Sequence, residues 1–478
     1  MFTRKDLVQR DYDFNSEEEL HKLSFTSSRV VNQLYNSYLP NEYKVTGFIQ
    51  NTAQFDGRLN NTETWGEGFD LATVNPYAYD KLVFCYFGLV GDQGVKKHVI
   101  EKSANDLMMF DNKYTPVPND SFGACQSFTN VGFEGWNDVA LPEKYNQRQC
   151  QGLLGGLRMM KEKNPELKLE MAIGGWSFSQ PFHHMVKTEG NRSMFIDGVK
   201  DILHRFPMFD SILIDWEYPC SHGDVNNEYS PEDCENYCKL IQELRMKLPQ
   251  FYGDINVTLP ATIDQLSKIN AKNLMLNGAS NIYLLTLDYF GGWCSELKHD
   301  SSLVCAQQAV DYLIGVNGVN PKSIHIGYRT GSKNAIDTEI LSWSPLKGKF
   351  KATFNSKGNP KVVGTFESAV STFNDIMYNY IDFESGKPMN GFKLHYDPVS
   401  KAEFLYNQKT KLFMSIETPK SVKSKAEFVR EKGLGGLFNQ SISADASGLL
   451  LNAARDGFGN KMQSTKINME KCYNIQQN

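Results

Sequence analysis

The chain has 478 residues, of which 41% are hydrophobic and 22% are charged, so it is ordinary globular material and long enough to bury a large core. Its formal net charge is −5 and no run of five like charges occurs, which argues against nucleic acid or a membrane surface as a partner. A neutral ligand is the more natural expectation.

The N-terminal sequence lacks the apolar segment that a secretory or twin-arginine pathway recognises, and no stretch approaches the about 20 apolar residues of a membrane span. The nine cysteines do not show the close pairing of a disulfide framework or a zinc site, so we expect most of them to be reduced. We expect synthesis in a bacterial cytosol, with any export by a route other than a classical signal peptide.

A polar N-terminal extension, residues 1–42, precedes short apolar runs that alternate with helical stretches. Such runs are typical of strands buried on both faces of a parallel sheet. Eight strands are predicted, near residues 44–48, 81–86, 167–173, 211–215, 256–259, 282–287, 323–327 and 435–438. This pattern predicts an α/β fold, a closed (β/α)8 TIM barrel over residues 43–460.

Two long segments interrupt the alternation of strands and helices. Residues 92–148 are rich in Asp, Asn, Pro and Gly and predict a long loop over the barrel mouth. Residues 332–417 are long enough for a small inserted α+β subdomain, and residues 461–478 form a C-terminal tail.

Two carboxylates follow the predicted fourth strand. Asp215 and Glu217 are two residues apart, so their side chains point to the same side, at the barrel end where TIM-barrel enzymes have their active sites. Adjacent carboxylates push their pKa values apart, which can keep one protonated near neutral pH as a general acid. A bare Asp-x-Glu is more often a salt-bridging or helix-capping pair, so the neighbouring residues decide.

The neighbours, Asp-Trp-Glu-Tyr-Pro after an apolar strand, resemble the signature of glycoside hydrolase family 18, the chitinase-like family. Further segments resemble this family in the same order along residues 43–455: Ala172-Ile173-Gly174-Gly175-Trp176, Leu285-Thr286-Leu287-Asp288, Tyr396-Asp397-Pro398 and Gly433-Leu434-Gly435-Gly436. The order of these segments makes the resemblance specific.

The resemblance implies substrate-assisted hydrolysis, in which the N-acetyl oxygen of the sugar attacks the anomeric carbon. Glu217 would be the acid and then the base, and Asp215 would orient the acetamido group. The substrate-binding positions would be Tyr218, Asp288, Trp293, Trp176, Gly174 and Gly175. Packing in the core or a loop remains an alternative for Trp293. The mechanism requires no cofactor and no metal.

Six positions depart from the family pattern: Phe48, Ala172 and Leu213 replace Tyr, Ser and the middle Asp of the signature, and Leu287, Gln440 and Gly331 replace Tyr, Trp and Tyr. A buried aspartate needs hydroxyl partners, so we expect the first three apolar replacements to pack together. The loss of these groups predicts reduced turnover.

Three other features have simpler interpretations. His183-His184 suggests a metal, but no acidic residue or cysteine lies at ligand spacing, so we expect packing or a surface position. Cys234 and Cys238 are expected to be core-facing thiols, and Phe87 to be barrel core.

Two functional hypotheses follow. The first is a family 18 protein that binds chitin or another N-acetylglucosamine glycan, or serves as an assembly subunit of a toxin-type complex, with weak or lost hydrolysis. The second is an active endochitinase or endo-N-acetylglucosaminidase in which Glu217 and Asp215 suffice. The departures favour the first hypothesis and the retained Glu217 favours the second.

Overall fold

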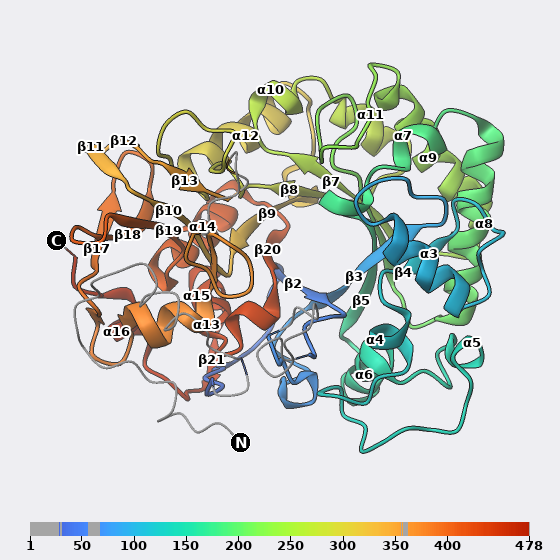
Figure 1. Ribbon diagram of the computed structural model, residues 1–478, viewed down its shortest axis with the longest axis horizontal. Helices are drawn as coiled ribbons and strands as arrows, with labels where there is room; N and C mark the ends of the chain where they lie inside the picture. Colours follow the sequence, from blue (N-terminus) through green and yellow to red (C-terminus); the bar gives the residue numbers. More distant parts are fainter. Residues whose placement is uncertain (1–27, 29–30, 56–66, 355, 357–361, 478) are drawn as a thin grey trace.

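The computed structural model describes residues 28, 31–55, 67–354, 356 and 362–477. Eight parallel strands form a closed barrel (Figure 1), in the order β2 (Lys44–Gln50), β20 (Gly436–Gln440), β9 (Ile324–Arg329), β8 (Ile282–Leu285), β7 (Asp254–Pro260), β6 (Ser211–Asp215), β5 (Lys168–Gly174) and β3 (Lys81–Leu89). Strand β2 pairs with both β20 and β3, which closes the sheet on itself. The predictions of eight strands and a TIM barrel are therefore confirmed.

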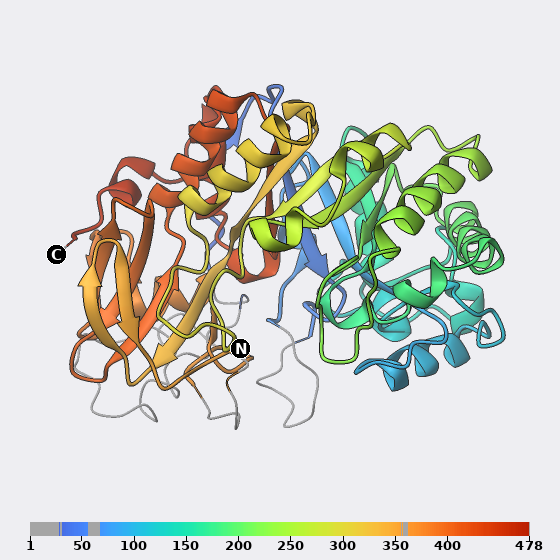
Figure 2. The same ribbon diagram turned by 90° about the horizontal axis from the view of Figure 1, so that it is seen from above.

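Helices surround the barrel (Figure 2) and bury their apolar faces against it. Among them are α6 (Gly152–Lys163), α8 (Glu189–Arg205), α9 (Asp233–Lys247), α12 (Leu303–Gly315), α14 (Pro419–Lys432) and α15 (Leu449–Gly457). Short helices follow individual strands: α7 (Phe182–Met185), α10 (Ile263–Leu266) and α11 (Ala271–Leu276). Local sequence signals begin and end these helices, as in α14, where Thr418 caps the first turn and Gly433 adopts a left-handed conformation at the end.

The first interruption contains more regular structure than the predicted loop. It forms α3 (Lys97–Asp106), β4 (Pro116–Pro118), α4 (Ser121–Cys125) and α5 (Leu141–Lys144). Strand β4 pairs antiparallel with the last three residues of β3, so it adds a short strand beside β3 at that end of the barrel. Some of the Asp and Asn residues that indicated a loop cap these short elements, such as Asp120 at the start of α4, whereas Pro116 and Pro118 lie within β4.

The second interruption forms the subdomain at the left of Figure 1. Its main sheet is antiparallel and contains β10 (Gly331–Ile336), β13 (Ala352–Thr353), β14 (Val370–Thr372), β17 (Lys393–Asp397), β18 (Ala402–Asn407) and β19 (Leu412–Ile416). A hairpin of β11 (Glu339–Trp343) and β12 (Leu346–Lys349), the short pair β15 (Ile381–Asp382) and β16 (Lys387–Pro388), and helix α13 (Phe373–Asp375) complete it. Because β10 continues directly from β9, the subdomain is attached at the barrel mouth.

The two ends of the described chain lie together. Strand β1 (Ser37–Tyr38) pairs antiparallel with β21 (Met462–Ser464), and α16 (Met469–Tyr473) follows. Most of the predicted N-terminal extension, residues 1–27 and 29–30, lies outside the described residues. Within the described part, no helix has the length and apolar character needed to cross a membrane.

Candidate active site

Strand β6 carries both carboxylates of the signature to the mouth of the barrel. Asp215 is the last residue of the strand and is 1% exposed, and Glu217 follows it and is 9% exposed. The Glu217 backbone N–H donates to Ser179 Oγ at 2.9 Å, and its carbonyl accepts from Asn227 Nδ2 at 3.1 Å. Glu217 is therefore held by the loops after β5 and β6, because each supplies one polar side chain.

The electrostatic environment keeps the two carboxyl groups in different states. Burial, followed by the charges of Asp215 and Asp288, raises the pKa of Glu217 well above its usual range, although Tyr218 and the Trp176 N–H donate to it. Burial raises the pKa of Asp215 to about 6, opposed by a hydrogen bond from Thr258. At neutral pH the pair therefore holds its proton mainly on Glu217, the state that a general acid requires.

One oxygen of Asp215 is left without a partner. Among the described residues, no group donates a hydrogen bond to Oδ1 of this buried side chain. Two residues earlier on β6 stands Leu213, whose side chain offers no polar group to this oxygen. Since an unsatisfied buried oxygen is costly, this atom is well suited to accept a hydrogen bond from a ligand.

The three apolar side chains that the sequence predicts to pack together do lie together inside the barrel. Phe48, Ala172 and Leu213 are 3%, 0% and 0% exposed. They belong to one apolar cluster, which also contains Val83, Cys85, Tyr283, Leu285 and Phe438. The cluster leaves no hydroxyl beside position 213 from Phe48 or Ala172, so these three replacements form one packing unit.

Asp288 is held by two cations that the sequence reasoning did not pair with it. Arg329 Nη2 donates to Asp288 Oδ1 at 2.6 Å, and Lys333 Nζ lies 3.1 Å from the same oxygen. Partial burial would raise the pKa of Asp288, but these two charges lower it to about 2. Arg329 also binds the buried Asp300. Arg329 is the last residue of β9, the seventh barrel strand, and this position at the mouth could have identified it as a site residue from the sequence.

The glycines at the end of β5 allow the chain to pass close to the acid pair. Gly174 and Gly175 have φ values of 110° and 91°, which favour glycine. A Cβ on Gly174 would lie 2.3 Å from the Asp215 carbonyl oxygen. This turn places Trp176, 40% exposed, with its ring centroid 6.4 Å from that of Tyr218.

Trp293 follows β8 on the rim and is 56% exposed. Its indole folds over Gly291, where an added Cβ would lie 2.3 Å from the ring. The side chain therefore packs on its own loop and still presents a large apolar area to solvent.

The other three positions that the sequence singled out as different from the family pattern are Gly331, Gln440 and Leu287. Gly331 and Gln440 line a cavity of about 230 Å³, together with Phe48, Tyr86 and Arg329. Leu287 is 4% exposed and packs against Gly327. Tyr86 was missed by the sequence reasoning, although it lies beside the strand-end residue Phe87. Burial raises the pKa of Tyr86, and the charges of Cys85, Asp215 and Glu217 contribute to this increase.

Cys234 corrects a prediction, because it forms a disulfide with Cys220 and is not a free thiol. The signal was missed because the two cysteines are 14 residues apart and meet only when the loop after Glu217 returns to α9. Cys238 is a half-buried thiol, and the other six cysteines are also free. Phe87 is fully buried, as predicted.

The comparisons with known proteins agree with this geometry. Residues 45–445 match the family described as "Glycosyl hydrolases family 18". Chitinase 1 of Yersinia entomophaga is 34% identical over an alignment covering 95% of this chain and 87% of the relative. Chitinase 2 of the same organism is 33% identical, with 99% and 81% covered.

Among solved structures, the chitinase Chi1 fitted into the Yersinia entomophaga toxin complex superposes with a TM-score of 0.86 at 31% identity. The superposition covers 98% of this chain and 99% of that one. Chitinase ChiA74 from Bacillus thuringiensis, at 20% identity and a TM-score of 0.69, shares the fold. With the family match, the full-length relatives and the acid pair at the end of the fourth barrel strand, the chain belongs to glycosyl hydrolase family 18 and is a chitinase-like protein.

Proposed function

We propose that this protein binds polymers of N-acetylglucosamine and hydrolyses their β-1,4 linkages slowly. The observation that carries the proposal is the pair at the barrel mouth, a protonated Glu217 beside Asp215, whose Oδ1 is free to accept a hydrogen bond. This combination supplies the acid and the orienting group of substrate-assisted cleavage.

In the proposed reaction, the acetamido N–H donates to Asp215 Oδ1 and the acetamido oxygen attacks the anomeric carbon. Glu217 transfers its proton to the departing glycosidic oxygen, and the negative charge of Asp215 stabilises the cationic oxazolinium ring. Glu217, now ionised, then removes a proton from the water that opens this ring. Trp176 and Trp293 offer apolar surfaces for neighbouring sugar rings.

The replacements explain why turnover is expected to be slow. Leu213 provides no second carboxylate to hold Asp215 in an alternative position, and Leu287 provides no hydroxyl for the reacting acetamide. Gln440 provides no indole under the sugar. Each loss weakens positioning of the substrate, so rate and affinity both fall while the acid is retained.

The test compares wild-type protein with Glu217→Gln on a fluorogenic chitotrioside from acidic to mildly alkaline pH, together with binding to chitin beads. Glu296→Gln is the matched control, because Glu296 is exposed on the segment after β8. We expect slow wild-type turnover that disappears in Glu217→Gln and persists in the control, with bead binding retained by all three. Binding without wild-type turnover would overturn the hydrolytic part, and neither binding nor turnover would overturn the whole proposal.

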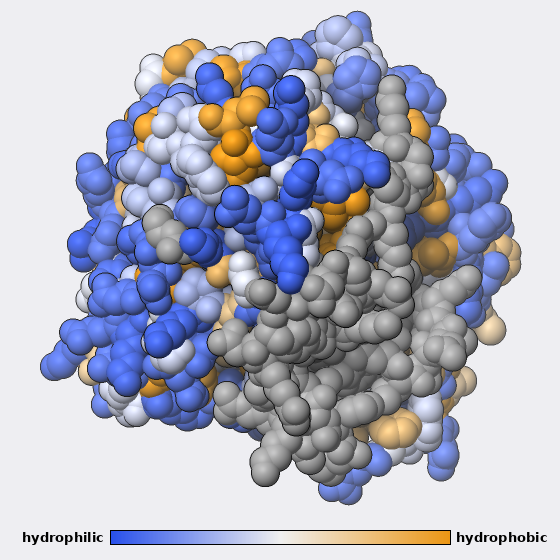
Figure 3. All heavy atoms as spheres, turned by 60° about the vertical axis from the view of Figure 1, so that its left-hand side comes forward, coloured by the Kyte–Doolittle hydropathy of each residue, from blue (hydrophilic) through white to orange (hydrophobic). Residues whose placement is uncertain are grey.

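A second candidate function, as a subunit of a larger assembly, has one specific observation in its favour. The solved structure with TM-score 0.86 is that of a chitinase fitted into a toxin complex, and it matches this chain along nearly its full length. The subdomain face shown in Figure 3 is mostly hydrophilic with small scattered apolar patches, so contacts there would be largely polar. Size-exclusion chromatography of a native extract should then give this chain far above its 54.2 kDa mass, and the purified chain at that mass.

A further inference from the structure

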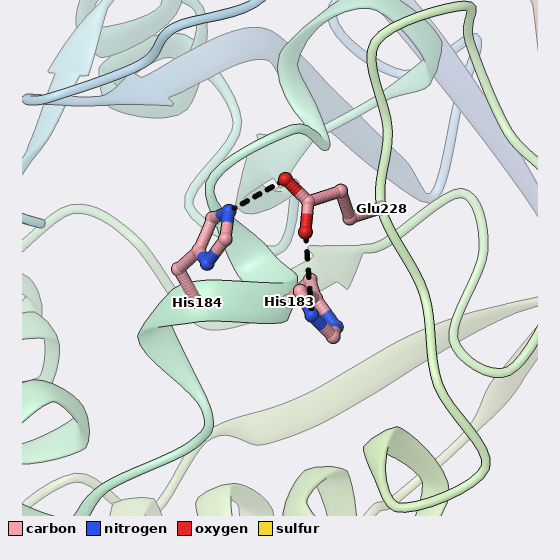
Figure 4. A group of neighbouring side chains, drawn as sticks. All are labelled: His183, His184 and Glu228. Atoms are coloured by element: carbon pink, nitrogen blue, oxygen red, sulfur yellow. Dashed lines mark ion pairs between the residues drawn. The ribbon is translucent and has the colours of Figure 1, made fainter.

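Two histidines and a glutamate converge beside the active-site loops (Figure 4). His183 and His184 lie on α7, and Glu228 lies in the loop between β6 and α9. Each of the three offers one ligand atom within 4.8 Å of the others. Glu228 Oε1 lies 3.4 Å from His184 Nε2, and Oε2 lies 3.9 Å from His183 Nε2. Because Glu228 is 44 positions from His184 in the sequence, ligand spacing along the chain did not reveal it.

A buried carboxylate orients one of the imidazoles. His183 Nδ1 lies 2.9 Å from Oδ1 of Asp233, at the start of α9, and both side chains are almost fully buried. A proton on Nδ1 shared with this carboxylate leaves the lone pair on Nε2, which faces Glu228. A carboxylate behind a histidine is the usual second partner at protein zinc sites.

The second imidazole and the local charges also suit a cation. His184 presents Nε2 to the Glu228 carboxylate at 3.4 Å, and a neutral imidazole is the form that binds a metal. Glu228, Glu232 and Asp233 supply negative charge around the two rings, against the positive charge of Lys187. The histidine ligands are soft enough to favour transition metals over Ca²⁺ or Mg²⁺.

We propose that His183 Nε2, His184 Nε2 and the Glu228 carboxylate form a site for a divalent transition metal of the zinc class. Two imidazoles and one carboxylate leave a position for water or an external ligand. Glu228 and His184 are 64% and 39% exposed, so this position faces solvent. The proposal does not depend on the proposed hydrolytic function.

The proposed metal site would connect α7, which follows β5, to the loop after β6 that contacts Glu217. Asn227, the residue before Glu228, donates to the Glu217 carbonyl oxygen at 3.1 Å. The Cys220–Cys234 disulfide closes the same loop at its base. A bound ion would therefore order the loop after β6 against α7 and stabilise the folded protein by mass action.

The experiment is titration calorimetry of the metal-free full chain with Zn²⁺, in the presence of millimolar Ca²⁺ and Mg²⁺, followed by thermal unfolding with and without Zn²⁺. His184→Ala and Glu228→Gln remove exposed ligands with little risk to folding. His98→Ala is the matched control. His98 lies on α3, away from the proposed site, is 93% exposed, and has its Nδ1 3.2 Å from the carboxylate of Glu101 on the same helix. Asp233→Asn tests the orienting carboxylate.

We expect one Zn²⁺ per chain and a higher melting temperature in its presence. Asp233→Asn should weaken affinity by about 10–100-fold. His184→Ala and Glu228→Gln should weaken it by at least that factor and lose the thermal shift, and His98→Ala should behave as wild type. Absence of Zn²⁺ binding by wild type, or unchanged affinity in both ligand variants, would overturn the proposal.

Discussion

The two sides of the barrel mouth present different kinds of side chain. On the side of β5 and β6, Asp215 and Glu217 retain the acid pair, with hydrogen bonds from Thr258, Tyr218 and the Trp176 backbone. On the side of β2, β9 and β20, Gly331 and Gln440 line a cavity. The acid pair thus lies on a different side of the mouth from this cavity.

The acid pair also differs from the apolar residues that precede it on the same strands, Ala172 on β5 and Leu213 on β6. The acid pair is supported by backbone and hydroxyl groups of adjacent loops, whereas Phe48, Ala172 and Leu213 are supported by apolar contacts within the barrel. Replacing a buried polar group by an apolar one of suitable size costs little when its partners are replaced too. Four substitutions test what the apolar cluster, the acid pair, the cavity and the rim of the mouth each contribute to stability, turnover and binding.

Leu213→Asp should have the largest effect. A carboxylate at this position is buried without a hydroxyl from Phe48 or Ala172, so we expect the free energy of unfolding to fall by about 3–5 kcal/mol. Adding Phe48→Tyr and Ala172→Ser should recover part of this loss and raise turnover above wild type. Denaturant unfolding and the fluorogenic assay measure both. A Leu213→Asp variant as stable as wild type would contradict the expectation that the apolar cluster excludes a carboxylate.

Asp215→Asn should follow, with a loss of about 10²–10³-fold in kcat because the charge that stabilises the oxazolinium ring is removed. The negative charge of Asp215 helps to raise the pKa of Glu217, so its removal lowers that pKa. The acid then loses its proton at lower pH, and the alkaline limb of the pH–rate profile should move toward acidic pH. Asp264→Asn, at a surface pair with Lys268, is the control. An unmoved alkaline limb contradicts the proposed coupling of the pair.

Gln440→Trp should strengthen substrate binding by about 1–3 kcal/mol, if an indole stacks on a sugar as aromatics stack on bases. The ring fills space in the cavity that Gln440 lines, so KM should fall with little change in kcat. Gln440→Leu is the control, since it is apolar and has no ring. Equal affinity gains in both variants would attribute the effect to apolar area and not to stacking.

Trp293→Ala should have the smallest effect, a weakening of chitin binding near the lower end of about 1–3 kcal/mol, because the indole is only half buried. Tyr252→Ala, at the opposite end of the barrel before β7 and 94% exposed, should leave binding unchanged. Bead-binding isotherms compare the two. A Trp293→Ala isotherm identical to wild type would favour the loop-packing alternative.

The predictable features were those encoded by neighbouring residues. The strand at 211–215 is a short run of apolar residues that ends in Asp215, so its burial and the position of the acid pair at its end follow from the local pattern. The departures at Phe48, Ala172 and Leu213 could be predicted to pack together because a buried aspartate and its hydroxyl partners are lost as a set.

The sequence by itself thus determined the barrel, the order of its strands and the acid pair, because each depends on local periodicity or on a contiguous motif. Only the tertiary structure decided which distant residues complete the site: Arg329 on Asp288, Cys220 with Cys234, and Glu228 beside His183 and His184. These contacts join loops from different strands, and their distances are set by closure of the barrel. Pairing of this kind has no periodic signature along the chain.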